Sequence, residues 1–159
     1  MEKKTFKKII AACFIFIIPS ILVYLFWLFN GKITNNSDYI IGFSNISMMK
    51  IFINNTIICL IMVVSGKYFK VFSSIVFFYN AVLFSFYFLI SLENYGSEFI
   101  FYKLIYYAPF EIFAISYSLV LSKKINEISK QTIHFNIFII ELFLLIAACL
   151  ETLVIHGIF

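Results

Sequence analysis

The chain has 159 residues, of which 63% are hydrophobic and 13% are charged, and its formal net charge at pH 7 is +4. Soluble domains are about 45–50% apolar and about 25% charged, so this composition excludes an ordinary soluble domain and predicts one integral membrane unit. The lysines are scattered in short segments without a basic groove lined by aromatic platforms, so the positive charge does not indicate a nucleic-acid partner.

Taken in chain order, the apolar runs predict an all-α fold, a polytopic membrane helix bundle. A helix needs about 20 residues to cross the apolar core of a bilayer. Runs of about this length cover residues 9–29, 48–65, 71–92, 104–122 and 133–155, which predicts about five transmembrane helices in a single domain over 1–159. The first run follows its lysines too closely for a cleavable signal peptide, so we expect an uncleaved first helix.

A short interfacial helix is expected around the start of the fourth run. Gly96-Ser97-Glu98 has the composition of a helix start. The tyrosines that follow it, over residues 99–107, are typical of a helix that lies at the level of the lipid headgroups.

The distribution of lysines predicts the orientation of the bundle. With the N-terminus inside, the cytoplasmic side collects nine lysines: Lys3, Lys4, Lys7, Lys8, Lys67, Lys70, Lys123, Lys124 and Lys130. The outer side receives only Lys32, Lys50 and Lys103. By the positive-inside rule we expect the N-terminus inside and the C-terminus outside.

All 12 basic residues are lysine, and Phe, Ile, Asn and Tyr are abundant. This composition is typical of an AT-rich coding sequence and favours a bacterial cytoplasmic membrane.

No motif indicates an enzyme, a cofactor or a metal. The chain carries no H-E-x-x-H, G-x-S-x-G, P-loop or G-x-G-x-x-G pattern. Cys13, Cys59 and Cys149 fall inside apolar runs without the spacing of metal ligands. His134 and His156 lie near opposite ends of one predicted helix, too far apart to share a metal. We therefore expect a non-enzymatic protein without a cofactor.

Carboxyl and amide side chains interrupt the apolar runs and mark the candidate working surface. A carboxylate near the bilayer centre costs about 2.5 kcal/mol or more on insertion scales, so such a residue is expected to face the protein interior or a wet cavity. The candidates are Asn54, Asn55, Asn80, Glu111, Glu141 and Glu151. Their depths along the runs predict two layers. The first holds Glu111, Glu151 and the two adjacent asparagines in the outer half, and the second holds Asn80 and Glu141 near the midplane.

These candidates belong to stripes of small and polar residues that recur at helical spacing. The stripes, in chain order, are Asn55, Cys59, Met62 and Gly66; Ser73, Asn80, Tyr87 and Ser91; Ala108, Glu111, Ser118 and Ser122; and His134, Glu141, Ala148 and Thr152. Small and hydroxyl residues let membrane helices approach closely, so helix packing alone accounts for many of them.

Two carboxyl groups in a medium of low dielectric constant cannot both ionise easily, so one is expected to hold a proton. That chemistry suits proton-coupled transport, and it equally suits a neutral acid hydrogen-bonded to an asparagine.

Four segments, in order, resemble the stage II sporulation protein M family. They are Ile51-Phe52-Ile53-Asn54-Asn55-Thr56, Tyr79-Asn80-Ala81, Phe110-Glu111 and Leu145-Ile146-Ala147-Ala148-Cys149-Leu150-Glu151. Family members show an apolar-Asn-Asn stretch, an Asn-Gly in the next helix, a Pro-His-Gly-x-x-Glu segment and a late apolar-Ala-Ala-x-x-Glu segment. The resemblance covers roughly residues 48–156, and the last segment is the most specific.

The chain also departs from this pattern. The Asn-Gly of the family stands here as Asn80-Ala81, and its Pro-His-Gly stands as Tyr106-Tyr107-Ala108. A role that depends on the histidine of the family is therefore in doubt for this chain. Small divergent members of the family resemble membrane subunits found beside ABC-type ATPases and bacteriocin peptides, where they are linked to export, maturation or immunity. The resemblance implies a multi-pass, non-enzymatic membrane component.

Three functions follow as hypotheses. The first is a membrane subunit of a peptide export or self-immunity system that works with a separate cytoplasmic ABC-type ATPase. The second is a structural subunit of a cell-envelope complex, such as the engulfment machinery of sporulation. The third is a self-sufficient immunity protein. Because the chain has no nucleotide site, we expect it to act through the bilayer, through itself or a second membrane subunit, and through an ATPase at the inner loops. Those loops carry Lys67, Lys70, Lys123 and Lys124.

Overall fold

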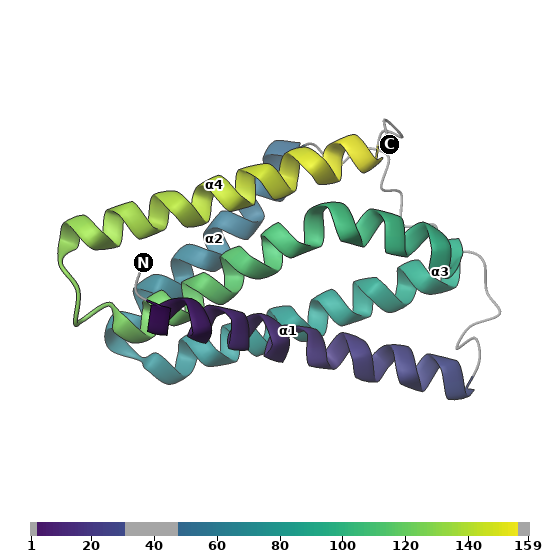
Figure 1. Ribbon diagram of the computed structural model, residues 1–159, viewed down its shortest axis with the longest axis horizontal. Coiled ribbons are helices and arrows are strands. Elements are labelled where there is room, and N and C mark those ends of the chain that lie inside the picture. The colour runs from purple at the N-terminus through teal and green to yellow at the C-terminus, as the bar shows by residue number, and fades with distance from the viewer. Residues whose placement is uncertain (1–2, 31–47, 156–159) are drawn as a thin grey trace.

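In the computed structural model, the described chain forms four α-helices packed into one bundle (Figure 1). The structure describes residues 3–30 and 48–155, and among these it describes the side chains of all but residues 3, 27, 30, 91–105, 154 and 155. The helices are α1 (Lys3–Asn30), α2 (Met48–Tyr68), α3 (Lys70–Lys124) and α4 (Lys130–Ile155). The prediction of an all-α bundle is confirmed for this part of the chain.

The long helix α3 turns back on itself. It has 55 residues, and a straight helix of that length would extend about 80 Å at 1.5 Å per residue. Figure 1 shows it running to one end of the bundle, bending there, and returning to the end where it began. We call residues 70–90 the first arm and residues 106–124 the second arm. The arms correspond to the predicted third and fourth runs, but the backbone stays helical between them instead of forming a loop.

Four stretches are long and apolar enough to cross a membrane, which supports a membrane-embedded protein. They are Lys4–Phe26, Met48–Tyr68, Lys70–Ile90 and Lys130–Leu153. The predicted span over 104–122 is not among the four, and its first two residues lie outside the described side chains. A total of five spans and a separate interfacial helix over 99–107 therefore stay predictions, and most of that interfacial segment lies where side chains are not described.

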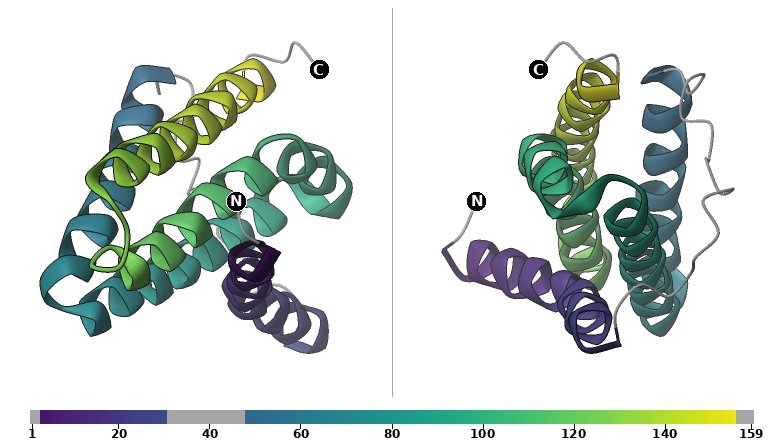
Figure 2. Two further views of the ribbon diagram at one scale, coloured as in Figure 1. Left: turned by 60° about the vertical axis from the view of Figure 1, so that its left-hand side comes forward. Right: turned by 90° about the vertical axis from the view of Figure 1, so that its right-hand side faces the viewer.

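The second arm of α3 occupies the centre of the bundle. Every residue from Ala114 to Ser122 is buried, and α3 packs against α1, α2 and α4. Both views in Figure 2 agree with Figure 1 in placing the second arm between α4 and α1. A helix enclosed by other helices needs no broad apolar face toward lipid, and small residues at its surface let its neighbours approach closely. This accounts for the serines that the second arm carries among its buried residues.

Short contacts between hydroxyl groups and backbone join α2 to the first arm of α3. The carbonyl oxygen of Met62 accepts hydrogen bonds from Ser65 Oγ at 3.0 Å and from Ser73 Oγ at 2.9 Å. On the second arm, Ser122 lies against Gly66, and a Cβ added to this glycine would overlap the Ser122 backbone. The stripe that the sequence predicted on α2, from Asn55 to Gly66, is thus a packing face, and its four members are buried.

The outer helices are attached by aromatic and polar contacts. On α1, the Phe16 ring packs edge-on against Phe77 with centroids 5.4 Å apart, and Ser20 Oγ lies 3.0 Å from Ser85 Oγ. On the opposite side, Phe113 and Phe143 join the second arm to α4 with ring centroids 4.6 Å apart. These contacts fix the positions of α1 and α4 around the central arm.

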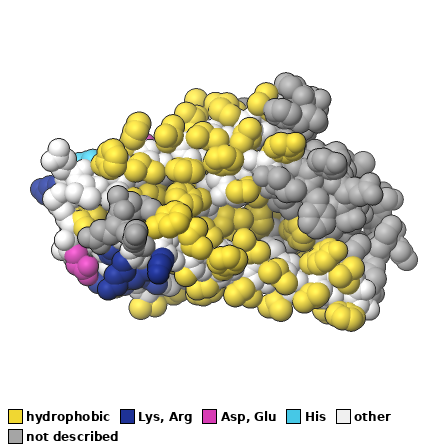
Figure 3. All heavy atoms as spheres, in the orientation of Figure 1, with side chains coloured by type: hydrophobic (Ala, Val, Ile, Leu, Met, Phe, Trp, Pro, Cys, Tyr) yellow, Lys and Arg dark blue, Asp and Glu magenta, His cyan; other side chains and the backbone are white. Residues whose placement is uncertain are grey.

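One end of the bundle collects the start of α1, the turn between α2 and α3, and the turn between α3 and α4 (Figure 1). Successive helices therefore run in alternating directions. The described lysines of these segments are Lys4, Lys7, Lys8, Lys67, Lys70, Lys123, Lys124 and Lys130. Figure 3 shows lysine side chains at this end and mainly hydrophobic side chains over the described part of the middle of the face. We call it the lysine-rich end, and its location on the cytoplasmic side stays a prediction.

Candidate functional site

Carboxyl groups from two helices come together in the half of the bundle away from the lysine-rich end. The side-chain amide of Asn55 on α2 lies close enough to the carboxyl group of Glu111, on the second arm of α3, to interact with it. Glu151 on α4 is close enough for its charge to interact with that of Glu111. The hydroxyl of Tyr107 lies within reach of both charges. We call Asn55, Tyr107, Glu111 and Glu151 the interior carboxyl cluster.

Helical spacing explains how each member reaches the cluster. Asn55 is 9% exposed and shares the packing face of α2 that is turned toward the second arm. Tyr107 and Glu111 are four residues apart on one helix and therefore lie on the same face. Glu151 follows the buried residues Ala147 and Ala148 on α4. Their small side chains allow close approach to the second arm.

The cluster is built to hold a proton or to receive a polar group. Asn55 brings an amide group next to the Glu111 carboxyl group, and amide groups can hydrogen-bond between membrane helices. Two negative charges in apolar surroundings repel each other, so one proton on the pair stabilises it. Within the described ranges, no group of three or more His, Cys, Asp or Glu side chains could bind a metal ion. The chemistry that these residues offer is therefore proton binding and hydrogen bonding.

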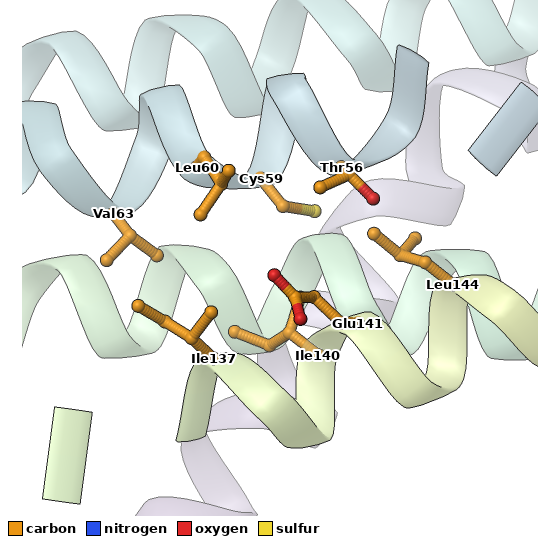
Figure 4. Close-up of a pocket in the computed structure, with 8 residues that line it drawn as sticks. All are labelled: Thr56, Cys59, Leu60, Val63, Ile137, Ile140, Glu141 and Leu144. Atoms are coloured by element: carbon orange, nitrogen blue, oxygen red, sulfur yellow. The ribbon is translucent and has the colours of Figure 1, made fainter. Parts of the chain in front are cut away.

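Glu141 lies apart from the cluster, in a hollow between α2 and α4 (Figure 4). The hollow is shallow, with a cavity volume of about 10 Å³. It is lined by Thr56, Cys59, Leu60, Val63, Ile137, Ile140, Glu141 and Leu144. Figure 4 shows the Glu141 carboxyl group directed toward α2. Thr56 Oγ1 is buried and has no hydrogen-bond partner.

The structure separates two other candidates from the positions that the sequence predicted for them. Asn54 is exposed, because consecutive residues of a helix point about 100° apart at 3.6 residues per turn and Asn55 takes the inward position. Asn80 donates a hydrogen bond from Nδ2 to the Val76 carbonyl oxygen of its own helix at 2.7 Å. No described contact joins Asn80 to Glu141, and their common layer near the midplane stays a prediction.

The four lysines expected to bind a partner differ in their surroundings. Lys67, Lys70 and Lys123 are exposed, whereas Lys124 Nζ donates a hydrogen bond to Thr5 Oγ1 on α1 at 2.7 Å. The two turns that carry them lie side by side, because Asn126 Nδ2 donates a hydrogen bond to the Lys67 carbonyl oxygen at 3.3 Å. Three of the four lysines are thus available to a partner, and the fourth joins two helices.

Sequence reasoning missed Tyr107 as a member of the cluster. The tyrosines near the start of the fourth run were expected at the headgroup level, and Tyr107 is instead partly buried beside two carboxyl groups. The available signal was its spacing of four residues from Glu111, which puts both side chains on one face of a helix.

No protein-family model, curated protein or solved structure matches the chain. The resemblance to the stage II sporulation protein M family stays a prediction from the quoted segments. Three of those segments supply Asn55, Glu111 and Glu151, which are members of the interior carboxyl cluster. The remaining segment supplies Asn80, whose side-chain amide bonds within its own helix.

Proposed function

We propose that this chain is the non-enzymatic membrane subunit of a bacteriocin-like peptide export or self-immunity system, acting with a separate ABC-type ATPase. The observation that supports it most is the interior carboxyl cluster. Asn55, Glu111 and Glu151 come from three segments far apart in sequence, yet their side chains lie within hydrogen-bonding or electrostatic reach. Each of these segments is one of those on which the family resemblance rests.

In this proposal the cluster is the working element. Carboxyl groups inside a membrane bundle are costly and mark functional positions by default. Gain or loss of one proton would change the charge between α2, the second arm of α3 and α4 by a full unit. Such a local change in charge biases the packing of the helices that carry the groups. The cluster would thereby couple proton or peptide binding to the spacing of these helices.

The ATPase would bind at the lysine-rich end. Lys67, Lys70 and Lys123 are exposed there, and the hydrogen bond between Asn126 and Lys67 holds the two turns together. A paired set of turns with fixed geometry can transmit movement of a bound ATPase to α2, α3 and α4. The bacteriocin-like peptide is the expected substrate.

The experiment is a functional assay in cells that express the chain together with the ATPase and peptide genes encoded beside it. Peptide release and survival against added peptide are both measured for wild type and for the double variant Glu111→Gln/Glu151→Gln. Glutamine keeps the shape and hydrogen bonding of each side chain but removes its titratable proton. Glu127→Gln is the matched control, because Glu127 is exposed in the turn after α3. The double variant should lose function at normal expression and the control should keep it.

Full release and survival in the double variant would reject the role of the cluster. Survival that persists after deletion of the ATPase gene would point instead to the self-sufficient immunity protein. Neighbouring genes for cell-wall hydrolases, with no effect on release or survival, would point to the structural subunit of an envelope complex. These outcomes separate the three hypotheses that the sequence left open.

A further inference from the structure

We infer that the hollow between α2 and α4 binds a transmembrane helix of a different polypeptide, one that carries a lysine or arginine side chain opposite Glu141. This goes beyond the proposed function and does not depend on it. The occupant is defined by its chemistry: an apolar helix with one basic group at mid-membrane depth.

The surroundings of the hollow fit a helix. Exposed apolar side chains follow it on both sides: Ile57, Ile61 and Val64 on α2, and Phe138, Leu142 and Leu145 on α4. Within each helix these residues are spaced three or four apart, so they form two apolar ridges with the hollow between them. A groove between apolar ridges receives the face of a third helix through close packing, with polar side chains supplying the specific contact.

Two polar groups in this groove lack partners. Among the described residues, no hydrogen bond or ion pair is formed by the Glu141 carboxyl group, and Thr56 Oγ1 is buried without a partner. Glu141 is 11 residues from the start of α4 at Lys130 and 14 from its end at Ile155, so it lies near mid-membrane depth. Ionisable side chains at that depth are almost always paired or face a protein interior. A basic group from a neighbouring helix would pair Glu141, and Thr56 could accept a hydrogen bond from it.

The described lysines of a second copy of this chain would not supply the basic group. The described lysines lie at helix ends, and Lys130, the nearest on α4, is 11 residues from Glu141, or about 16 Å at 1.5 Å per residue. In a parallel or antiparallel dimer, these lysines would stay near the membrane surfaces while Glu141 stays near the centre. Charge complementarity therefore favours a different polypeptide.

The test uses the full-length chain with a donor dye on a C-terminal tag, reconstituted in phosphatidylcholine vesicles. Two synthetic leucine–alanine helices of membrane-spanning length carry an acceptor dye, one with a central lysine and one with leucine at that position. Energy transfer should show that wild type binds the lysine peptide roughly tenfold more tightly than the leucine peptide. Glu141→Gln should remove this preference. Ile75→Ala is the control, because Ile75 is exposed on the first arm of α3, outside the hollow and both apolar ridges, and it should keep the preference.

A charge exchange separates loss of binding from loss of folding. Glu141→Lys should bind a peptide with a central glutamate in preference to the lysine peptide. The inference is overturned if wild type binds both peptides equally, or if Glu141→Gln keeps the preference for lysine. It is also overturned if wild type self-associates without peptide and this is lost in Glu141→Gln, because a second copy would then be the occupant.

Discussion

Gly66 on α2 lies against the backbone of Ser122 on α3 with no space for a side chain between them. A Cβ built on Gly66 would stand 2.5 Å from the Cβ of Ser122, well inside the contact distance of two carbon atoms. Both residues are buried and the contact is to backbone, so neither helix can relieve an overlap by rotating a side chain. This contact sets the distance between α2 and the second arm at the lysine-rich end.

We therefore expect Gly66→Ala to destabilise the bundle. Overpacking in a closely packed interior costs about 1–3 kcal/mol, and a backbone contact favours the upper part of that range. The melting temperature of the purified protein in mild detergent measures the effect. Val64→Ala, at an exposed position two residues earlier, is the control and should melt close to wild type. Equal melting of Gly66→Ala and wild type would show that the helices separate freely here.

Tyr117→Phe should weaken the attachment of α4 to the second arm. The Tyr117 hydroxyl donates a hydrogen bond to Asn136 Oδ1 at 2.6 Å, and such bonds between membrane helices average about 0.6 kcal/mol and reach about 1.7. Unfolding free energies for Tyr117→Phe, Asn136→Ala and the double variant give the coupling between the two side chains. Tyr79→Phe, at an exposed position, is the matched control. Strictly additive effects would mean that the bond contributes nothing.

The arrangement of helices was predictable where the sequence carries a strong one-dimensional signal. Apolar length identified α1, α2, the first arm and α4, and the α2 stripe from Asn55 to Gly66 is buried as expected. Glu111 and Glu151 were expected in one layer with Asn55, and their interactions agree. The sequence could not reveal that residues 114–122 of the second arm are all buried, because burial depends on which helices surround them.

Failures at other positions have local causes. Asn54 and Asn55 lie at nearly the same depth along α2, so both were expected in one layer. Successive residues of a helix nevertheless point in different directions, and Asn54 is exposed. Depth also paired Asn80 with Glu141, although Asn80 bonds to the carbonyl oxygen of Val76 one turn earlier in its own helix. Side chains that can bond to their own backbone need no partner on another helix.

Glu151→Gln alone should preserve expression and membrane insertion but lower function. Glutamine retains the size and hydrogen bonding of the side chain, so the packing of α4 against the second arm should survive. Only the titratable proton of the pair with Glu111 is lost. Peptide release or cell survival, measured beside the amount of protein in the membrane fraction, separates the two effects. Wild-type activity at equal protein level would mean that this carboxyl group is not required.

Lys123→Glu and Lys124→Glu should have different consequences. Lys123 is exposed at the lysine-rich end, so its reversal should release the ATPase while the melting temperature stays unchanged. Lys124 bonds to Thr5 on α1, so its reversal should lower stability by up to about 1 kcal/mol, as expected for a partly exposed polar contact. Co-purification in mild detergent and thermal unfolding measure the two effects. ATPase retention in Lys123→Glu would exclude this lysine from the docking surface.

The lysine-rich end should face the cytoplasm. Reporter fusions within residues 122–130 should report a cytoplasmic location, and fusions after Phe159 should report the outer side. Because the start of α1 and the two turns lie at one end (Figure 1), a fusion within 66–70 should agree with the fusion in 122–130. A cytoplasmic signal from the C-terminal fusion would contradict the predicted orientation.

The enclosure of the second arm also bears on how the chain enters the bilayer during synthesis. Helices partition into lipid according to their own apolarity, and this arm carries a glutamate and several serines, which lower its apolarity. The helical hairpin of α3 offers a route for inserting the second arm. The first arm is apolar enough to anchor itself in the bilayer, and it can then cover one side of the second arm. We expect a chain that ends after Lys124 to insert the second arm efficiently. A chain from which residues 70–90 are deleted should leave the second arm outside the bilayer. Glycosylation mapping can measure both outcomes. The first arm would then be needed for the insertion of the second arm as well as for the contacts of the finished bundle.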